Sequence, residues 1–528
     1  MSDDREPRHP EPTRRNADGD EMNAWDDAYE EEVDADAIDL DELEGDGDAI
    51  VRVPDPFGGD ADDDDPDAEQ DATDERILDS LEDREAADAA YAQLLERAGE
   101  TAIEPRLAAT ARAVELLGDP QRSYGVVHVT GTNGKGSTAR IAEALLRAHG
   151  LRTGLLTSPH LERVTERILI DGEPVSDAVF ARVWEEITPF LDLVDGELER
   201  DGQRRLTFFE AITVLAYAIF ADAPIEVAVV EVGMGGTWDS TNVADGDVAV
   251  LTPIALDHTN RLGATVEAIA TEKAGIVKPG AIVVTAEQEP GVLAIVEARA
   301  AEVGAARVLV EGRDFEREST LAVGGQLVTV RGLAAAYEDQ PLPLLGRHQG
   351  QNAALALVAV EAFLGAGTRP IAQDVLSSAF AAVTSPGRLE VVGTDPSVVV
   401  DAAHNPHGAQ SLATALQEVF AFEHVQLVVG MVEGKDAAGV LRILEPHVEE
   451  VVVTQSDSER AVPADDLARI AVEVFGAERV SVEPVLERAV EMAREQAEDR
   501  GGAVVVTGSI TLLGAVQAKA RAERWMHR

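Results

Sequence analysis

The chain has 528 residues, a formal net charge of −55 and no cysteine. Its length allows two or three domains, and the lack of cysteine excludes disulfides, thiol catalysis and cysteine-ligated zinc. The acidic balance argues against nucleic acid as a partner, and the sequence has neither a signal peptide nor an apolar run of membrane-spanning length, so we expect a soluble, cytoplasmic protein.

Acidic residues are concentrated at the N-terminus. Residues 1–75 contain 31 Asp and Glu against 5 Arg, a net charge of −26. Because this segment has few apolar side chains to bury, nothing offsets its ordering entropy, and we predict a disordered acidic tail over 1–75. A solvated extension is the simpler interpretation, and docking of a basic partner is the alternative.

From residue 76 the pattern is helical, and from residue 126 short β-rich runs alternate with helical stretches. The β-rich runs are 126–130, 154–157, 227–232, 248–252 and 282–285, and the helical stretches include 137–149 and 208–220. This alternation predicts an α/β fold with a mostly parallel sheet covered by helices. Short strands with glycine turns near 306–345 are expected to form an antiparallel flap on that sheet.

A second alternating block follows Ser385-Pro386-Gly387. Its expected strands are 398–401, 425–430, 450–454 and 503–507, and its expected helices include 408–420, 463–475 and 484–498. We therefore predict two domains, 76–384 and 385–528. Ligands of such sheets bind at the carboxyl ends of the strands, so the cleft between the two blocks is the expected active site.

A glycine-rich stretch indicates a phosphate-binding loop. The chain has only five lysines, and Lys135 lies in Thr-Gly-Thr-Asn-Gly-Lys-Gly-Ser-Thr (130–138), between an expected strand and an expected helix. Glycines let backbone N–H groups approach phosphate oxygens at a helix N-terminus. Ser137 or Thr138 would coordinate Mg²⁺, although Gly136 separates the lysine from the serine, unlike the strict P-loop spacing. A glycine turn without a ligand is the alternative.

Three candidate metal ligands follow other expected strands: Glu231, His258 and Ser158. Oxygen ligands with one imidazole suit a Mg²⁺ ion that also binds nucleotide phosphates. Taken singly, Glu231 or His258 is more often a core residue with satisfied hydrogen bonds. Their combination with the glycine-rich loop is what favours a site.

The ordered motifs between about 85 and 520 resemble the folylpolyglutamate synthase and dihydrofolate synthase family of the Mur ligase superfamily. Besides 130–138, the motifs are Thr-Ser-Pro-His-Leu (157–161), Glu-Arg-Ile (166–168), Phe-Phe-Glu-Ala (208–211), Glu-Val-Gly-Met-Gly-Gly-Thr-Trp-Asp-Ser-Thr-Asn (231–242), Asp-His-Thr-Asn-Arg-Leu-Gly (257–263), Glu-Lys-Ala-Gly-Ile (272–276), His-Gln-Gly-Gln-Asn-Ala (348–353), Pro-Gly-Arg-Leu-Glu (386–390), Asp-Ala-Ala-His-Asn-Pro (401–406) and Gly-Ser-Ile (508–510). The acidic tail lies outside this resemblance.

The resemblance implies an N-terminal Mur-ligase-like ATPase domain, a smaller Rossmann-like domain, and ATP bound between them. Two Mg²⁺ ions would be held by Ser137, Ser158, Glu231 and His258, and Lys273 would be carbamylated to add a carboxylate there. The residues that would contact ATP are Thr132, Asn133, Gly134, Lys135, Gly136, Ser137, Thr138, Asn352, Arg388 and Asp401. Asn352 has an alternative role in pinning a helix.

The implied reaction joins L-glutamate to tetrahydrofolate, to dihydropteroate or to both, through an acyl phosphate formed with ATP. His404 would lie near glutamate and the phosphates, with a turn residue as the alternative, and Phe208 and Phe209 would stack on a pterin, although such a pair is more often core. Lys435-Asp436 would lie at the edge of the site or form a plain surface ion pair. We expect a monomer that binds no membrane.

Two positions depart from many relatives: Thr237-Trp238 stands where they have Arg-Leu, and Ser385 where they have tryptophan. Neither change is expected to touch the metal positions. Two rivals remain. A ligase of nucleotide-linked peptidoglycan precursors usually has an additional N-terminal domain, which residues 1–75 do not resemble. A non-catalytic ATP-binding scaffold would not need Glu231, His258 and Lys273 together.

Overall fold

The computed structural model describes residues 66–99, 104–420 and 422–526. Up to residue 65 the predicted acidic tail lies outside the described residues. Helix α1 (Pro66–Leu95) begins inside the segment that we expected to be disordered. Its second half packs through Ala87, Ala90 and Leu94 into an apolar cluster of the first sheet.

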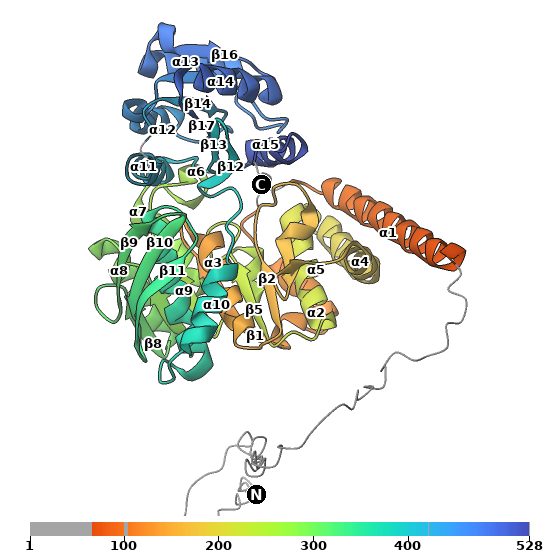
Figure 1. Ribbon diagram of the computed structural model, residues 1–528. Coiled ribbons are helices and arrows are strands. Elements are labelled where there is room, and N and C mark those ends of the chain that lie inside the picture. Colours follow the sequence, from red (N-terminus) through yellow and green to blue (C-terminus); the bar gives the residue numbers. More distant parts are fainter. Residues whose placement is uncertain (1–65, 100–103, 421, 527–528) are drawn as a thin grey trace, which may run out of the picture. The chain divides into compact units, whose positions relative to one another are not determined.

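The first sheet has eight strands in the order β4-β3-β2-β5-β1-β6-β7-β8 (Figure 1). The six strands β2, β5, β1, β6, β7 and β8 pair in parallel. At the β2 edge, β3 pairs antiparallel with β2, and β4 pairs antiparallel with β3. Their bounds are β1 Gly125–Thr130, β2 Thr153–Leu156, β3 Ile168–Ile170, β4 Glu173–Pro174, β5 Val227–Glu231, β6 Val248–Leu251, β7 Ile282–Thr285 and β8 Arg307–Val310. The predicted parallel α/β sheet is therefore confirmed.

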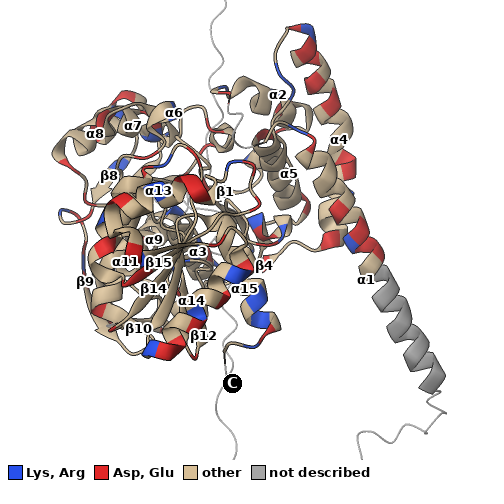
Figure 2. Ribbon diagram, turned by 90° about the horizontal axis from the view of Figure 1, so that it is seen from above, with Lys and Arg blue, Asp and Glu red and all other residues tan. Residues whose placement is uncertain are grey.

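Helices cover both faces of this sheet because its central strands are apolar on both sides. Val127 and Val129 of β1 point into one core and Val126 into the other, as the two-residue period of a strand requires. The helices of this part are α2 Ala108–Leu116, α3 Lys135–Ala148, α4 Asp177–Arg200, α5 Phe208–Asp222, α6 Thr259–Leu262, α7 Val266–Lys273, α8 Pro290–Val303, α9 Arg347–Gly365 and α10 Gln373–Ala382. Acidic residues recur along α4 (Figure 2).

The expected antiparallel flap on the main sheet is only partly correct. Residues 307–310 join the main sheet as its parallel edge strand β8. The next three strands, β9 (Glu316–Ala322), β10 (Gly325–Arg331) and β11 (Ala336–Leu342), form a separate antiparallel sheet in the order β11-β10-β9. Val328 and Val330 of β10 pack in the same core as α9, so the small sheet covers that helix.

The second sheet has six strands in the order β12-β13-β17-β14-β15-β16, parallel except for β12. Its elements are β12 Glu390–Thr394, β13 Ser397–Val400, α11 Pro406–Ala415, β14 Val425–Val429, α12 Ala437–Leu444, β15 Glu450–Val453, α13 Ala464–Phe475, β16 Val480–Val482, α14 Leu486–Arg500, β17 Ala503–Thr507 and α15 Ile510–Ala522. Separate apolar clusters on its two faces involve α11 to α13 and α14 to α15. The predicted smaller α/β block is confirmed.

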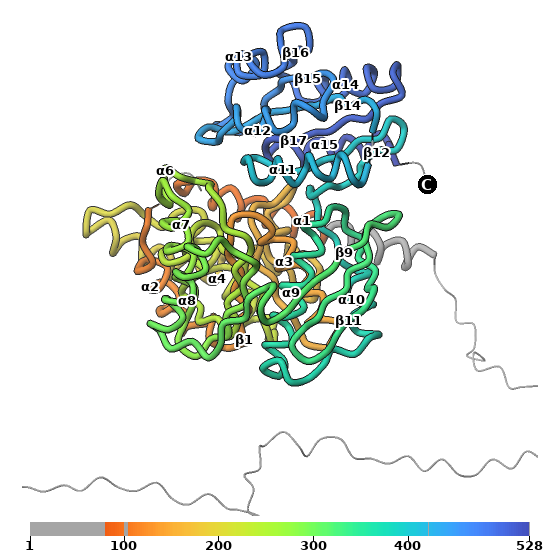
Figure 3. Tube along the Cα trace, turned by 90° about the vertical axis from the view of Figure 1, so that its left-hand side faces the viewer, coloured from red at the N-terminus to blue at the C-terminus, as the bar shows by residue number. Residues whose placement is uncertain are grey.

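Helices α11 and α15 lie on the side of the second sheet that faces the first sheet (Figures 1 and 3). Gly514 of α15 approaches the Leu161 carbonyl so closely that a Cβ at this position would lie 2.1 Å from the oxygen. The two α/β blocks are therefore in direct contact, through α15 of the second and the loop after β2 of the first. No helix within the described ranges combines the length and apolar character needed to cross a bilayer.

A buried carboxylate ties the small sheet to α9. Glu361 is fully buried and accepts hydrogen bonds from Tyr337 Oη at 2.6 Å and from the backbone N–H groups of Leu333 and Ala334. Replacing Glu361 by Ala leaves these buried donors unsatisfied, so we expect the free energy of unfolding to fall by about 3 kcal/mol. Urea denaturation measures this free energy of unfolding. The control Glu316→Ala, at an exposed ion pair with Arg331, should cost less than about 1 kcal/mol; equal losses would contradict this role.

Candidate active site

The loop between β1 and α3 is shaped by glycines that approach neighbouring groups closely. A Cβ on Gly131 (φ +144°) would lie 1.8 Å from Thr252 Oγ1, and one on Gly134 (φ +88°) would lie 2.4 Å from Asn352 Oδ1. No other residue type fits either position. Lys135 is the first residue of α3, and its Nζ donates to the Thr132 carbonyl at 3.2 Å. The loop thus presents a helix N-terminus and an ammonium group together.

A cavity of about 540 Å³ opens at this loop, between the carboxyl ends of the two sheets. The expected cleft is therefore present. The predicted site residues that line it are Thr132, Asn133, Gly134, Lys135, Gly136, Ser137, Ser158, Phe209, Glu231, His258, Lys273, Asn352, Arg388, Asp401 and His404. Thr138 and Phe208 do not line it: both are buried in the protein interior.

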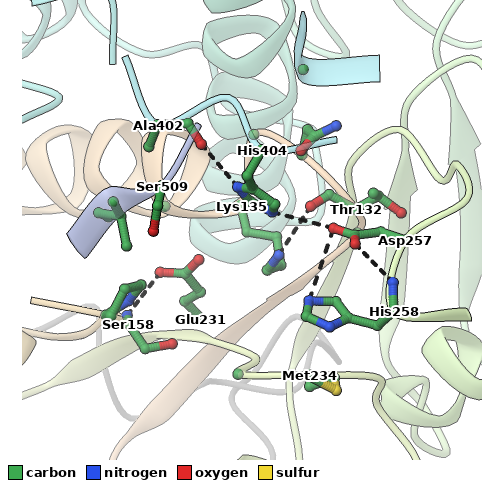
Figure 4. A pocket seen from close by; sticks show the side chains of 18 of the residues that line it. Thr132, Lys135, Ser158, Glu231, Met234, Asp257, His258, Ala402, His404 and Ser509 are labelled. Carbon is green, nitrogen blue, oxygen red and sulfur yellow. Dashed lines mark hydrogen bonds and ion pairs between the residues drawn. The ribbon is translucent and has the colours of Figure 1, made fainter. Parts of the chain in front are cut away.

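Glu231 ends β5 and points into the cavity beside the loop, opposite His404 and Asp257 (Figure 4). Its Oε2 accepts the Ser158 backbone N–H at 3.1 Å. Burial raises the pKa of Glu231, and the positive charge of Lys135 opposes that shift. A Cβ on Gly136 would lie 3.3 Å from Glu231 Oε2, so this glycine keeps the carboxylate reachable from the loop.

The hydroxyl of Ser137 is already engaged. Its Oγ lies 2.8 Å from Ser385 Oγ, one of the positions where the chain departs from many relatives. The expectation that this departure does not touch the metal positions is therefore wrong. A serine is small enough to reach Ser137 with a hydrogen bond, which the sequence alone does not place because the two residues lie in different segments.

His258 follows β6 with a left-handed backbone (φ +49°). Burial and the nearby Lys435 lower the pKa of His258 to about 3, so its imidazole is neutral and able to act as a ligand. Its Nε2 lies 3.2 Å from Lys435 Nζ. Any cation bound by His258 would therefore be close to an existing positive charge.

These donors fit Mg²⁺ that takes its other ligands from phosphate and water. A carboxylate, two serine hydroxyls and an imidazole are suitable ligand types, and all line the same cavity. Among the described residues, however, no three His, Asp or Glu side chains come together as a metal cluster. The protein alone therefore does not form a complete cage, and the nucleotide would have to complete the coordination.

Lys273 is buried at the end of α7, and its Nζ donates to the Gly131 carbonyl at 2.6 Å. Burial, with a further contribution from the charge of Lys135, lowers the pKa of Lys273 to about 7. A substantial fraction of the amine is therefore neutral near pH 7, whereas an exposed lysine would be charged. Only a neutral amine is able to react with carbon dioxide.

Asp257 binds three side chains of the second block. It accepts hydrogen bonds from Lys435 Nζ at 2.7 Å and Asn405 Nδ2 at 2.9 Å, and His404 Nε2 lies 3.3 Å away. Burial by itself would raise the pKa of Asp257. The His404 hydrogen bond and the Lys435 charge nevertheless hold this pKa well below its usual range. Lys435 is thus neither paired with Asp436 nor on the surface: the side chains of Lys435 and Asp257 are 7% and 8% exposed.

The three expected nucleotide contacts outside the glycine loop have different local roles. Asn352 is buried on α9, where its Nδ2 donates to Gln349 Oε1 at 2.9 Å. Asp401 accepts the backbone N–H groups of Leu389 and Ala403, each at 2.9 Å, and so fixes the chain on both sides of β13. Among the described residues, the Arg388 guanidinium makes only a long hydrogen bond of 3.4 Å to the Gly387 carbonyl.

The two adjacent phenylalanines lie in different environments. Phe208 is 4% exposed, and the guanidinium carbon of Arg167 lies over its ring, 5.2 Å from the centroid of the Phe208 ring. Phe209 lines the cavity above Gly233, where a Cβ would come within 2.4 Å of its ring. Only Phe209 is therefore placed to stack on a ligand, with Met234 and Trp238 in the same wall.

Several cavity residues were missed as site candidates, notably Asp257, Ser509, Arg460 and His160. Asp257 and Ser509 stand inside motifs that were recognised, next to His258 and after Gly508, so the motifs themselves carried the signal. Arg460 belongs to a loop of the second block with no motif, and nothing in the sequence points to it.

The fold and this site define a Mur-type ligase. The Mur ligase middle domain matches residues 129–360, and the Mur ligase glutamate ligase domain matches residues 387–510. The chain belongs to the folylpolyglutamate synthase and dihydrofolate synthase family, whose members are ATP-dependent ligases.

Two relatives and two solved structures document this membership. The chain is 42% identical over 440 residues to the dihydrofolate synthase/folylpolyglutamate synthase of Mycobacterium tuberculosis, covering 79% of this chain and 90% of that protein. It is 38% identical to the folylpolyglutamate synthase of Lacticaseibacillus casei, over 64% of this chain and 79% of that one. The Mycobacterium tuberculosis folylpolyglutamate synthase complexed with ADP and AMPPCP has a TM-score of 0.79 and 41% identity, over 83% and 99% of the two chains. E. coli FolC in complex with DHPP and ADP has a TM-score of 0.71 and 30% identity, over 83% and 98%.

The buried pair of Asp257 and Lys435 should contribute strongly to stability. We expect Asp257→Asn to lower the free energy of unfolding by about 3 kcal/mol, because it leaves the buried Lys435 ammonium without a counter-charge. Asp245→Asn is the matched control, since Asp245 pairs with Lys278 but its side chain is 66% exposed. It should cost less than about 1 kcal/mol in urea unfolding. Similar losses in the two variants would show that the Asp257 pair is not special.

The lowered pKa of Lys273 predicts a pH dependence of stability. The unfolded chain holds this proton up to about pH 10.4, whereas the folded chain releases it near pH 7. Between these values the unfolded state binds more protons, so the stability of the wild type relative to Lys273→Met should rise with pH. Urea unfolding of both proteins at pH 7 and pH 9, in buffer free of carbon dioxide, measures this. A difference that is constant or falls with pH would contradict the burial of a titrating amine.

Proposed function

We propose that the protein joins L-glutamate to a folate-type acceptor in an ATP-dependent reaction at this cleft. The observation that carries the proposal is the arrangement around Lys135: a glycine loop and helix N-terminus share one cavity with Glu231, and loops of the second sheet close it. This arrangement suits a triphosphate. Relatives named for folate ligation, and the complexes of two of them with nucleotides, support the choice of substrates.

The reaction we propose has two chemical steps. A carboxylate of the acceptor attacks the γ-phosphate of ATP, which forms an acyl phosphate and releases ADP. The neutral amine of L-glutamate then attacks the acyl carbon, inorganic phosphate leaves, and the nitrogen loses a proton. The loop N–H groups and Lys135 hold the phosphates and offset the repulsion between carboxylate and triphosphate. Asn352, Arg388 and Asp401 are proposed to position the rest of the nucleotide, and His404 the glutamate.

Ser137, Ser158, Glu231 and His258 are proposed to hold two Mg²⁺ ions together with the phosphates. The metal would supply charge neutralisation at the transferring phosphoryl group. Lys273 lies next to the loop at the Gly131 carbonyl, and its lowered pKa favours reaction of the amine with carbon dioxide. We propose that the resulting carbamate adds the further carboxylate that the described side chains do not provide. Mass spectrometry of the intact protein tests this modification. The wild type should be heavier than its sequence mass by one carbon dioxide, and Lys273→Arg should lack this increase.

The acceptor ring is proposed to stack on Phe209, and Trp238 lines the same cavity. Phe208 does not contact the acceptor, because its side chain is buried in the core. We favour both tetrahydrofolate and dihydropteroate as acceptors. We further propose a monomer with domains at 76–384 and 385–528.

The deciding experiment measures phosphate release with dihydropteroate, tetrahydrofolate or a cell-wall precursor, each with and without L-glutamate. Release that needs no glutamate, or only the cell-wall precursor, would refute the proposal.

The role of Lys135 predicts a large kinetic effect. Lys135→Ala should lower ATP-dependent glutamate ligation by about two to three orders of magnitude, because the transferred phosphoryl group loses a fixed positive charge. Lys519→Ala is the control, since Lys519 is paired with Glu523 on α15 and away from the cavity. Near-normal turnover of Lys135→Ala would show that the loop does not hold the triphosphate.

A further inference from the structure

A second cavity, of about 510 Å³, adjoins the first at the start of α3. The residues that line both cavities are Gly136, Ser137, Ser158, Pro159, Glu231, Arg388 and Ile510. The second one continues past these residues to the segment 161–166 and to α15. No aromatic side chain of the described residues lines it. It therefore offers nothing on which a ring system would stack, and suits a polar, non-aromatic ligand.

The carboxylates of this second cavity already have hydrogen-bond donors. Glu166 accepts the three consecutive backbone N–H groups of residues 161–163 at 2.8 to 3.1 Å. Glu390 accepts a backbone N–H group at 2.7 Å and the Gln517 amide at 2.6 Å. Glu162 forms an ion pair with Arg521. These hydrogen bonds and this ion pair hold the chain in place, and none of them involves the two other arginines of the cavity wall, Arg388 and Arg140.

Of these two, Arg388 is already proposed to position the nucleotide, which leaves Arg140, one turn after Gly136 on the same side of α3. Within the described residues, its guanidinium makes no hydrogen bond and no ion pair. Burial lowers the pKa of Arg140, and the charges of Glu231, Glu166 and Glu143 oppose that shift. A half-buried guanidinium without a direct partner has lost part of its hydration, and a carboxylate ligand would compensate for this with a bidentate hydrogen bond. The activity proposed above does not use Arg140.

We propose that the second cavity binds the glutamyl part of an acceptor that already carries glutamate, with Arg140 holding the α-carboxylate of its terminal residue. The inference rests on the proposed function. The reacting γ-carboxylate must reach the phosphate beside Ser137, and the α-carboxylate belongs to the same residue, so it falls within the adjoining cavity. Dihydropteroate has a single carboxyl group, which reacts, and so it does not use this subsite. Arg140 is thus a specificity-determining residue for glutamylated acceptors.

Two probes that differ only in the glutamyl group test the subsite: pteroic acid and pteroylglutamic acid. Their binding to the full chain is measured calorimetrically with a non-hydrolysable ATP analogue present. The wild type should bind pteroylglutamic acid more tightly, and Arg140→Gln should lose about tenfold in that affinity while its affinity for pteroic acid is unchanged. Arg147→Gln is the matched control: Arg147 is on the same helix α3, is ion-paired with Glu143 and lines neither cavity, so this variant should change neither affinity.

The melting temperature separates binding from folding. Arg140→Gln removes a half-buried charge that has no hydrogen-bond partner among the described residues, so it should not lower the melting temperature. Arg140→Lys keeps the charge without the bidentate geometry and should recover part of the preference. An equal loss for both probes, no loss at all, or a raised KM for L-glutamate with dihydropteroate as acceptor would overturn the subsite. A wild type that ligates glutamate yet does not prefer pteroylglutamic acid also overturns it, whereas a wild type that ligates none overturns the proposed function.

Discussion

The carboxylate of Asp257 is the group through which the two sheets meet at the cleft. It comes from the loop after β6, and its partners Lys435, Asn405 and His404 all come from the second block. Asn405 also bonds to Asn133 of the glycine loop, with an Nδ2 to Oδ1 distance of 3.2 Å. Because the pair of Asp257 and Lys435 is buried, its attraction is strong and each partner depends on the other. The buried charge of Asp257 therefore helps to fix the relative position of the loop, the histidines and the second sheet, together with the contacts of Ser137 with Ser385 and of Glu162 with Arg521.

Close approach of the loop backbone to neighbouring side chains is the second constraint on the site. Gly131 and Gly134 leave no room for a side chain beside Thr252 and Asn352, so the loop lies directly against β6 and α9. The buried charged groups Glu231 and Lys273 border the same loop. Burial favours the uncharged form of each group, so it raises the pKa of Glu231 and lowers the pKa of Lys273. Such groups respond strongly to the arrival of phosphate and metal charges, which is what phosphoryl transfer requires of its surroundings.

Most of the fold was predictable because its strands are short apolar runs separated by helices of ordinary length. The edge strand β16 (Val480–Val482), by contrast, is only three residues long and half exposed, so it gives no periodic signal. The strands β9 to β11 alternate as expected, but whether they extend the main sheet or pair among themselves depends on α9, which they cover. The start of α1 within the acidic segment was missed because charge content alone does not exclude a helix.

The sequence by itself determined the order of the elements, the glycine loop before α3 and the set of polar residues that follow the strands. These are local properties, since strand ends and glycine turns are set by neighbouring residues. Only the tertiary structure decided which of two adjacent phenylalanines faces the cavity, because successive helical residues point about 100° apart and the neighbouring core fixes the rotation. It also decided that Lys435 pairs with Asp257, that Ser385 meets Ser137, and that Arg140 lines the second cavity without a hydrogen bond to any of the described residues. Contacts between residues so distant in the chain depend on how the two sheets pack, which no local pattern records.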